Sequence, residues 1–360
     1  MTPPEYNVTG IDYSQRGHFS YSGPLIDVHA HVMVTRPDDP VSGPPKGSGS
    51  GGSIAQAEQM LEVATEFGIQ RTISMCFPDD IPPLCERFSK DQLGFNGSIV
   101  KKSVDAPDDE AYGLLERFLE LGVEILKFWS APRGRERGLY VDAPWRIEAA
   151  RRARAAGVRI IMVHVADPDV WFRTVYTDVA KFGTKADQYV PFERMLQLFP
   201  DITWIGAHMG GDVEHPDHLE ALLEKYPHLY FDTSATKWQV REASRHPDAV
   251  RSLMCRHPDR FLFGSDLVTR HNLVREHYVS RYWCQRTLWE SSWQGPSPIA
   301  DPDYKPEPGE AEQLRLNGVA LPPEVLRKVY HDNAARLLSR RSGNVQPLGK
   351  NADKDKGEVA

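Results

Sequence analysis

The feature that most constrains the fold is a set of eight short apolar runs, separated by longer segments with helical spacing. The runs lie at 25–32, 71–77, 95–100, 124–130, 159–166, 202–209, 229–235 and 261–267. They show no strict alternation of apolar and polar residues, which is typical of parallel strands buried on both faces. Helical spacing is clearest at 54–68, 109–122, 145–157 and 191–199. The chain therefore repeats a strand followed by a helix.

Eight such repeats predict an α/β protein with a (β/α)8 TIM barrel in a single domain. An open doubly wound sheet has the same alternation, but the first run is followed by neither GxGxxG nor GxxxxGK[ST]. We expect the barrel at 24–340, after an N-terminal extension at 1–23. Loop insertions are expected at 35–53 and 290–321, and a charged, disordered tail at 341–360.

Composition narrows the class of partner. The net charge of −7 leaves no basic stripe for a nucleic acid. No window approaches the ~20 apolar residues of a membrane span, and the first residues do not resemble a secretion signal, so we expect a cytoplasmic protein. The four cysteines form no CxxC pair and are expected to be buried thiols. A small-molecule substrate is the expected partner, and a homodimer is left open.

Ionisable side chains stand near the ends of five of the apolar runs. They are His29, His31, Lys127, His164, His208 and Asp266. The two-residue period of a strand turns His29 and His31 to the same face. Burying so many ionisable groups costs several kcal/mol unless they pair or bind a metal. Since catalytic residues of this fold come from the C-terminal ends of several strands, these residues predict a metal site at one end of the barrel.

Several motifs, in this order, resemble the amidohydrolase superfamily. They are LIDVHAHV, IIMVHV, ITWIGAHMGG, FDTSA, FLFGSD and VYHDNAARLL, and the likeness spans about residues 24–340. The resemblance is closest to the amidohydrolase-related branch, which includes aminocarboxymuconate semialdehyde decarboxylase and resorcylate-type decarboxylases. It implies that His29, His31, His164 and Asp266 bind one divalent metal, usually zinc in such proteins. Three imidazoles and one carboxylate are also a ligand set that suits Zn²⁺ on chemical grounds.

The resemblance leaves His208 beside the metal, where His208 and Asp266 could handle protons as the catalytic residues. Lys127 has two interpretations. In binuclear amidohydrolases a lysine of the fourth strand is carboxylated and bridges two metals. The interpretation that we favour keeps Lys127 as an ammonium that binds a substrate carboxylate or pairs with Asp266, because this branch resembles single-metal members.

Substrate contacts are expected from loops near the same end of the barrel. Trp171 and Arg173 lie in a long aromatic loop after the fifth run, and Arg270 follows the eighth. Arginines after the fourth run, such as Arg133, also border the expected opening, so the substrate is expected to be anionic. Asp232 is expected to be structural.

These observations predict a metal-dependent hydrolase in which a metal-activated water attacks a small carboxylate-bearing substrate. The alternative is a non-oxidative decarboxylase (carboxy-lyase) of the same family, which would use the same ligands. A third hypothesis is a catalytically inactive barrel that acts as a binding protein. Because the hydrolase and the decarboxylase share their metal ligands, the motifs do not separate them.

Overall fold

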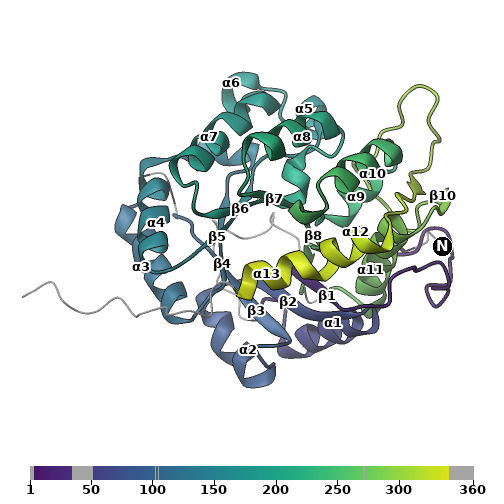
Figure 1. Ribbon diagram of the computed structural model, residues 1–360, viewed down its shortest axis with the longest axis horizontal. Helices are drawn as coiled ribbons and strands as arrows, with labels where there is room; N and C mark the ends of the chain where they lie inside the picture. Colours follow the sequence, from purple (N-terminus) through teal and green to yellow (C-terminus); the bar gives the residue numbers. More distant parts are fainter. Residues whose placement is uncertain (1–3, 35–51, 102, 104, 271, 340–360) are drawn as a thin grey trace, which may run out of the picture.

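The computed structural model describes residues 4–34, 52–101, 103, 105–270 and 272–339. Its main sheet has nine strands, all parallel, in the order β8-β7-β6-β5-β4-β3-β2-β1-β9. The strands are β1 Leu25–His31, β2 Ile69–Cys76, β3 Leu93–Ser98, β4 Ile125–Trp129, β5 Ile160–His164, β6 Thr203–Gly206, β7 Leu229–Asp232, β8 Phe261–Leu262 and β9 Leu267–Val268. Figure 1 shows helices surrounding this sheet.

The two outermost strands of this order, β8 and β9, are parts of one segment. β8 pairs with β7 and β9 pairs with β1. Between them, the backbone N–H of Val28 donates to Phe263 O (2.9 Å), and that of Asp266 donates to His29 O (2.7 Å). The sheet therefore closes, and the predicted TIM barrel is confirmed. The eighth run is not one continuous strand as predicted, because Asp266 adopts a left-handed backbone with φ 59°.

Helices follow most of the strands. They are α1 Ile54–Glu66, α2 Ile81–Arg87, α3 Asp108–Glu120, α4 Pro144–Ala155, α5 Asp169–Thr174, α6 Val179–Phe182, α7 Lys185–Leu198, α8 Pro216–Lys225, α9 Thr236–Ala243, α10 Pro247–Arg256, α11 Arg275–Glu290, α12 Pro323–Arg327 and α13 Asn333–Ser339. The helix expected at 191–199 begins earlier. Thr184 and Asp187 form a capping box that starts α7 at Lys185, and Pro191 lies inside the helix.

The barrel interior is a compact apolar cluster that is separate from the larger core under the outer helices. It includes Val28, Ile73, Met162 and Ile205, and α13 adds Leu337 and Leu338 to it. In Figure 1, α12 and α13, drawn in yellow, cross in front of the strands. The strand residues in this cluster include Ile125 and Ile160, the first residues of β4 and β5, so α13 covers the N-terminal end of the strands and leaves their C-terminal end for the site.

The expected extension and one expected insertion are ordered parts of the fold. Near the N-terminus, His18 lies 2.8 Å from the hydroxyl of Thr287 on α11, and the indole N–H of Trp283 donates to Gln15 O. The segment 290–321 carries a two-stranded antiparallel sheet, β10 Gln294–Pro296 with β11 Arg315–Asn317. Residues 35–51 of the expected insertion at 35–53 lie outside the described residues, and so does the whole of the expected tail at 341–360.

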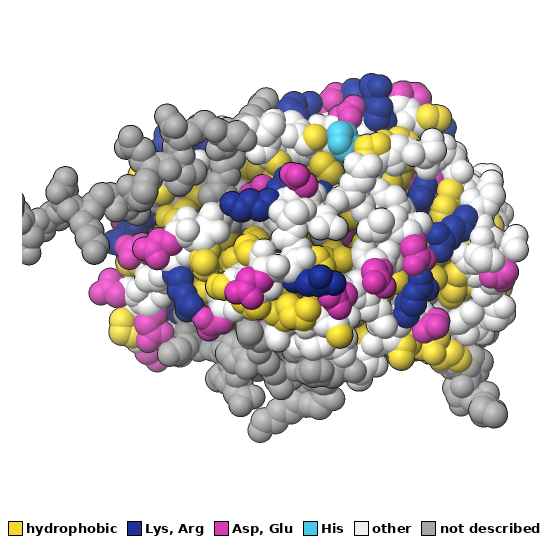
Figure 2. Space-filling view, turned by 90° about the horizontal axis from the view of Figure 1, so that it is seen from below, with side chains coloured by type: hydrophobic (Ala, Val, Ile, Leu, Met, Phe, Trp, Pro, Cys, Tyr) yellow, Lys and Arg dark blue, Asp and Glu magenta, His cyan; other side chains and the backbone are white. Residues whose placement is uncertain are grey.

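Two further expectations bear on the partner. Figure 2 shows Lys and Arg side chains interspersed with Asp and Glu on the face that it displays, rather than gathered into a basic stripe. Within the described ranges, none of the helices has the length and apolar content needed to cross a bilayer. The four cysteines were expected to be buried. This is confirmed for Cys76 and Cys284, but Cys255 is only partly buried and Cys85 is exposed.

Packing of α13 against the barrel interior should contribute measurably to stability. We expect Leu337→Ala to lower the free energy of unfolding by about 2–5 kcal/mol, because it leaves a cavity in the closed end of the barrel. Urea denaturation followed by circular dichroism measures this. The matched control is Leu198→Ala on α7, whose side chain is 43 % exposed, with an expected change within about 0.5 kcal/mol. Equal effects of the two substitutions would contradict the assigned role of α13.

Candidate metal centre

The first strand reaches the site through a β-bulge. Asp27 is opposite Thr72, but the next paired residue, Ala30, is opposite Ser74, so β1 has one residue more than β2 in this interval. Val28 packs in the barrel interior, and His29 and His31 line a cavity at the C-terminal end of the strands. The bulge therefore lets both the apolar residues of the first half of β1 and the two histidines face inward.

Asp27, which sequence analysis did not single out, holds this bulge. Its carboxylate is completely buried and accepts hydrogen bonds from the backbone N–H groups of His29 and Ser265, both at 3.0 Å, and from the Ser265 hydroxyl at 2.5 Å. Burial raises the pKa of Asp27 to about 7, although these donors oppose the rise. Asp27 thereby ties β1 to the segment that closes the barrel. A charged residue inside the run LIDVHAHV was the available signal.

Three potential ligand atoms converge where β1 meets that segment. Nε2 of His31 lies 2.9 Å from Oδ1 of Asp266, and Nε2 of His29 lies 3.5 Å from the same oxygen. All three residues belong to a group whose ligand atoms lie within 4.8 Å of one another. Burial would raise the pKa of Asp266, but the nearby imidazoles of His208, His31 and His29 outweigh burial and lower it. Asp266 is therefore an anion beside two histidines.

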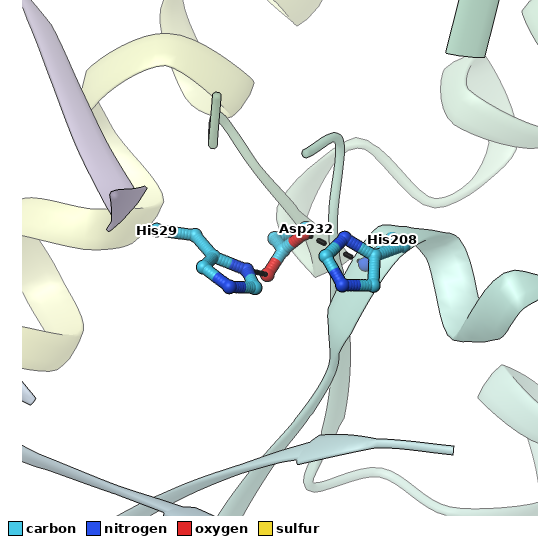
Figure 3. Close-up of side chains that lie close together, drawn as sticks. All are labelled: His29, His208 and Asp232. Carbon is cyan, nitrogen blue, oxygen red and sulfur yellow. Dashed lines mark hydrogen bonds and ion pairs between the residues drawn. The ribbon is translucent and has the colours of Figure 1, made fainter. Parts of the chain in front are cut away.

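On its other side, His29 is bound by Asp232. Nδ1 of His29 donates to Oδ2 of Asp232 at 2.9 Å, as Figure 3 shows. Oδ1 of Asp232 accepts from the hydroxyl of Ser234 and from the backbone N–H groups of His208 (2.9 Å) and Ser234 (3.0 Å). Because Nδ1 of His29 carries the proton, its Nε2 has a free electron pair directed toward Asp266. A carboxylate that orients a histidine in this way is typical of metal centres.

The same network fixes the tautomer of His208. The hydroxyl of Ser234 donates its single proton to Asp232, so Nδ1 of His208, 2.7 Å from Oγ of Ser234, must donate to that oxygen. Nε2 of His208 then has the electron pair. Burial holds the pKa of His208 well below its usual value, so the ring is neutral at physiological pH.

Sequence analysis had expected His208 in the sixth strand, but it lies in the turn that follows this strand. β6 ends at Gly206, and the turn Ala207–Gly211 follows with left-handed backbone at His208 (φ 58°), Met209 (φ 51°) and Gly210 (φ 70°). At Gly211 a Cβ would overlap the carbonyl group of Ala166, so this turn can pass β5 only with glycine there. Strained backbone of this kind often accompanies functional sites.

His164 ends β5 in the same cavity but is anchored separately. Its Nε2 lies 2.7 Å from Oδ1 of Asp167, whose other oxygen accepts from the hydroxyl of Tyr176. The ring centroids of His164 and His208 are 4.8 Å apart. Among the described residues, the ligand groups around this cavity combine His29 with His31 and Asp266, or with His208 and Asp232, and neither group includes His164. Of the four expected ligands, His29, His31 and Asp266 thus form one group, and His164 lies outside it.

Lys127 on β4 points into this cavity with a buried ammonium. Its Nζ has no hydrogen-bond partner among the described residues, and only 2 % of the residue is exposed. Burial lowers the pKa of Lys127 to about 8, against the attraction of Asp232 and Asp266. A buried cation without a hydrogen-bonding partner is costly. The expected pairing with Asp266 is thus limited to electrostatic attraction over a longer distance.

The cavity has a volume of about 300 Å³, and aromatic rings form much of its wall. It is lined by His29, His31, Met75, Lys127, Trp129, Ala131, Arg133, His164, Asp167, Trp171, His208, Trp238 and Asp266. Trp238, on α9, was not anticipated. Its ring contacts both His208 and His164, with centroids 5.2 and 6.0 Å apart. A planar molecule of modest size fits such a space.

Of the expected substrate-binding residues, Lys127 and Trp171 line this cavity, whereas Arg173 and Arg270 do not. Arg173 lies on the surface, where its guanidinium is 3.6 Å from the Glu307 carboxylate. Arg270 lines a neighbouring cleft. The spacing of residues in a loop does not reveal which side chains turn inward, which is why Arg173 appeared equivalent to Trp171.

The donor set fits a divalent metal. His29 and His31 present ring nitrogens beside the Asp266 carboxylate, and the Asp232 bond leaves Nε2 of His29 free to coordinate. Neutral imidazoles with one or more carboxylates suit Zn²⁺, Mn²⁺ and similar ions. His164 could add a ligand through its Nδ1, since its Nε2 is engaged by Asp167.

The role of Asp232 can be tested through metal binding. We expect Asp232→Asn to weaken the affinity for Zn²⁺ or Mn²⁺ about 10- to 100-fold, because His29 loses the partner that orients it. Isothermal titration of the metal-depleted protein measures the affinity, and circular dichroism checks the fold. Asp248→Asn, at an exposed position on α10, serves as the control and should bind metal normally. Unchanged affinity in a folded Asp232→Asn variant would contradict this role.

Comparison with solved structures supports the same architecture. A structural-genomics protein described as amidohydrolase II is 19 % identical, with a TM-score of 0.50, and the match covers 88 % of this chain and 99 % of that one. A Staphylococcus aureus protein classed with the amidohydrolases gives 12 % identity, the same coverage and a TM-score of 0.50. For 5-carboxyvanillate decarboxylase from Sphingomonas paucimobilis the identity is 13 %, the coverage 88 % and 99 %, and the TM-score 0.47. The first two likenesses, at these low identities, show the fold alone.

The sequence itself matches a family model. The model describes amidohydrolases and matches residues 26–340, which is most of the chain. A search of curated proteins found no match. The resemblance inferred from the motifs is confirmed by the family match, and so is the expectation of an enzyme of this type. The chain belongs to the amidohydrolase family.

Proposed function

We propose that this protein is a metal-dependent hydrolase that acts on a small, carboxylate-bearing, planar substrate. The observation that carries the proposal is the convergence of His29, His31 and Asp266 in one cavity. The same cavity holds the ammonium of Lys127, which has no hydrogen-bond partner in the part of the chain that the structure describes. The histidines and the carboxylate supply ligands for a cation, and Lys127 supplies a separate positive charge for an anion. A catalytically inactive binding protein would not need both features.

The ligand set suits zinc or manganese. When bound, such a divalent metal would act as a Lewis acid that activates water or polarises an oxygen of the substrate. His29, His31 and Asp266 would hold it, with His164 as the fourth ligand. We assign one metal and keep Lys127 as an ammonium that binds the substrate; carboxylation of Lys127 would instead favour two metals.

His208 is positioned to accept a proton. Its Nδ1 donates to Ser234, and its neutral ring presents the electron pair of Nε2. A lowered pKa keeps the base in its unprotonated form, although it also makes the base weaker. Asp266, ionised beside the imidazoles, can orient the attacking water. Both residues then act at the reacting centre.

Recognition would depend on Lys127 and the tryptophans. The ammonium of Lys127 can pair with a carboxylate of the substrate, which would satisfy its missing hydrogen bonds. Trp129, Trp171 and Trp238 supply flat apolar surfaces around that position. An aromatic carboxylate or an unsaturated lactone that carries a carboxylate meets both requirements.

Decarboxylation is the second candidate, because the aromatic walls would exclude water from a carboxylate that is about to leave as CO2. This reaction needs an acid that protonates the carbon from which CO2 departs. The neutral His208, with its only proton directed at Ser234, favours the role of base over that of acid. We therefore place hydrolysis first.

The two reactions differ in what enters the product. The metal-loaded protein is tested with a panel of aromatic carboxylates and carboxylated lactones in oxygen-18-labelled water. We expect the product to contain one oxygen atom from the water, measured by mass spectrometry. A decarboxylase would release CO2 and, in D2O, place deuterium on the vacated carbon. His29→Ala and chelator treatment should abolish turnover, whereas His246→Ala, at an exposed position, should not. Deuterium incorporation with loss of CO2 would replace hydrolysis with the second candidate.

The carboxylate-binding role of Lys127 predicts a loss of affinity. Lys127→Met keeps the length of the side chain and removes its charge, so we expect benzoate to bind about tenfold or more weakly, because a charge-assisted hydrogen bond is lost. Competition or calorimetry with benzoate measures this without turnover. Lys225→Met, at an exposed position on α8, is the control. Equal benzoate affinity in the Lys127→Met variant would remove Lys127 from substrate recognition.

A further inference from the structure

A second and larger cleft opens beside the cavity that holds the histidines. Its volume is about 690 Å³, and it shares Trp171, Trp238 and Asp266 with the inner cavity. The two indole rings meet edge to face, with centroids 5.4 Å apart, and Asp303 fixes Trp171 through its indole N–H at 3.1 Å. The inner cavity and this outer cleft are thus neighbours across a wall of two tryptophans.

Basic side chains gather in the outer cleft from three parts of the fold. Lys237 comes from α9, Arg270 from the segment after β9, and His277 and Arg281 from α11. Arg281 is the most deeply buried of these, with a side chain only 4 % exposed. Burial lowers the pKa of both Lys237 and Arg281. Cations drawn out of water in this way are suited to an anion that enters the cleft.

Lys237 is one of the cations of this cleft for which the described residues provide no ion pair. Within the described ranges its ammonium has no carboxylate within 4.0 Å, although Glu5, Asp301 and Asp303 attract it from further away. Of these acids, Asp301 is ion-paired with Arg241, and Asp303 accepts from Trp171. Lys237 therefore remains available to a ligand.

One carboxylate already occupies part of this cleft. Oε1 of Glu5, from the N-terminal segment, lies 3.4 Å from both Nη2 of Arg281 and Nδ1 of His277. These neighbours lower the pKa of Glu5 to about 2, His277 having the largest effect. The Glu5 side chain is 55 % exposed, so it does not seal the cleft. Glu5 thus shows that Arg281 and His277 together accept a carboxylate in this cleft.

We propose that the outer cleft is a second carboxylate subsite and that the substrate is an elongated dicarboxylate. One carboxylate would pair with Lys127 in the inner cavity, and the other would extend past Trp171 and Trp238 to Lys237 and Arg270. This inference rests on the proposed function, since it takes Lys127 as the first anchor. A carboxylate is favoured because Arg281 and His277, which line the same cleft, bind that of Glu5.

The proposal is tested by calorimetry, which measures how tightly pairs of aromatic acids of increasing length bind to the metal-loaded protein. The dicarboxylates are isophthalate, naphthalene-2,6-dicarboxylate and biphenyl-4,4′-dicarboxylate, each compared with the matching monocarboxylate. For at least one pair we expect the dicarboxylate to bind about tenfold more tightly, as one additional charged hydrogen bond would give. If no pair shows this advantage in the unmodified protein, the second subsite is excluded.

Variants locate the advantage in the protein. Lys237→Met, and independently Arg270→Gln, should remove the preference for the dicarboxylate while leaving the affinity for the monocarboxylate unchanged. Glu5→Gln should increase the preference, because it removes a competing carboxylate, and Lys225→Met should change nothing. A preference that survives both Lys237→Met and Arg270→Gln would overturn the proposal.

The same titrations keep the two proposals separate. Lys127→Met should weaken monocarboxylates and dicarboxylates together. If monocarboxylate affinity is indifferent to Lys127→Met while Lys237→Met still removes the preference for dicarboxylates, the cleft binds carboxylates but the proposed first anchor is wrong. If Lys127→Met weakens both acids and the unmodified protein shows no preference, the first anchor is supported and the second subsite is wrong.

Discussion

The site depends on one buried carboxylate, that of Asp232. One of its oxygens orients His29, and the other accepts from the hydroxyl of Ser234 and from the backbone at His208. A buried carboxylate is costly unless its lone pairs are satisfied. Here the donors that satisfy Asp232 also determine which nitrogen of His29 and of His208 is protonated. Burial would raise the pKa of Asp232, but the attraction of His29 outweighs burial and lowers it. One anion thereby orients the imidazole of His29 on β1 and holds the backbone of His208 in the turn after β6.

Much of this arrangement could be predicted from the sequence, because the C-terminal ends of parallel strands meet at one end of a barrel. That rule predicts that six ionisable residues lie together, and all of them line one cavity: His29, His31, Lys127, His164, His208 and Asp266. Asp27 was missed because a bulge is a mismatch between two strands, which one run of residues does not reveal. The position of His208 in a left-handed turn was missed for a similar reason, since the turn depends on the distant Asp232.

The direction of side chains outside the strands was harder to predict from the sequence. Trp171 and Arg173 are two residues apart on the short helix α5, which places them on different faces. Only Trp171 reaches the cavity, where it meets Trp238 from α9 and is held by Asp303 from the segment 290–321. Three segments that are far apart in the chain thus make one wall. Neither periodicity nor composition indicates such a meeting, because it is determined by how the loops pack on the finished barrel.

The charges around the cavity connect metal binding with the choice of substrate. Asp167, Asp232 and Asp266 contribute three carboxylates, and Lys127 and Arg133 contribute two cations, so the protein alone has an excess of one negative charge there. An anionic substrate would be repelled by this excess, despite the presence of Lys127. A divalent cation beside Asp266 changes the balance to one positive charge, which matches one carboxylate. Under the proposed function, binding of a carboxylate in the inner cavity would therefore be coupled to occupancy of the metal centre, whereas the cations of the outer cleft would attract an anion without it.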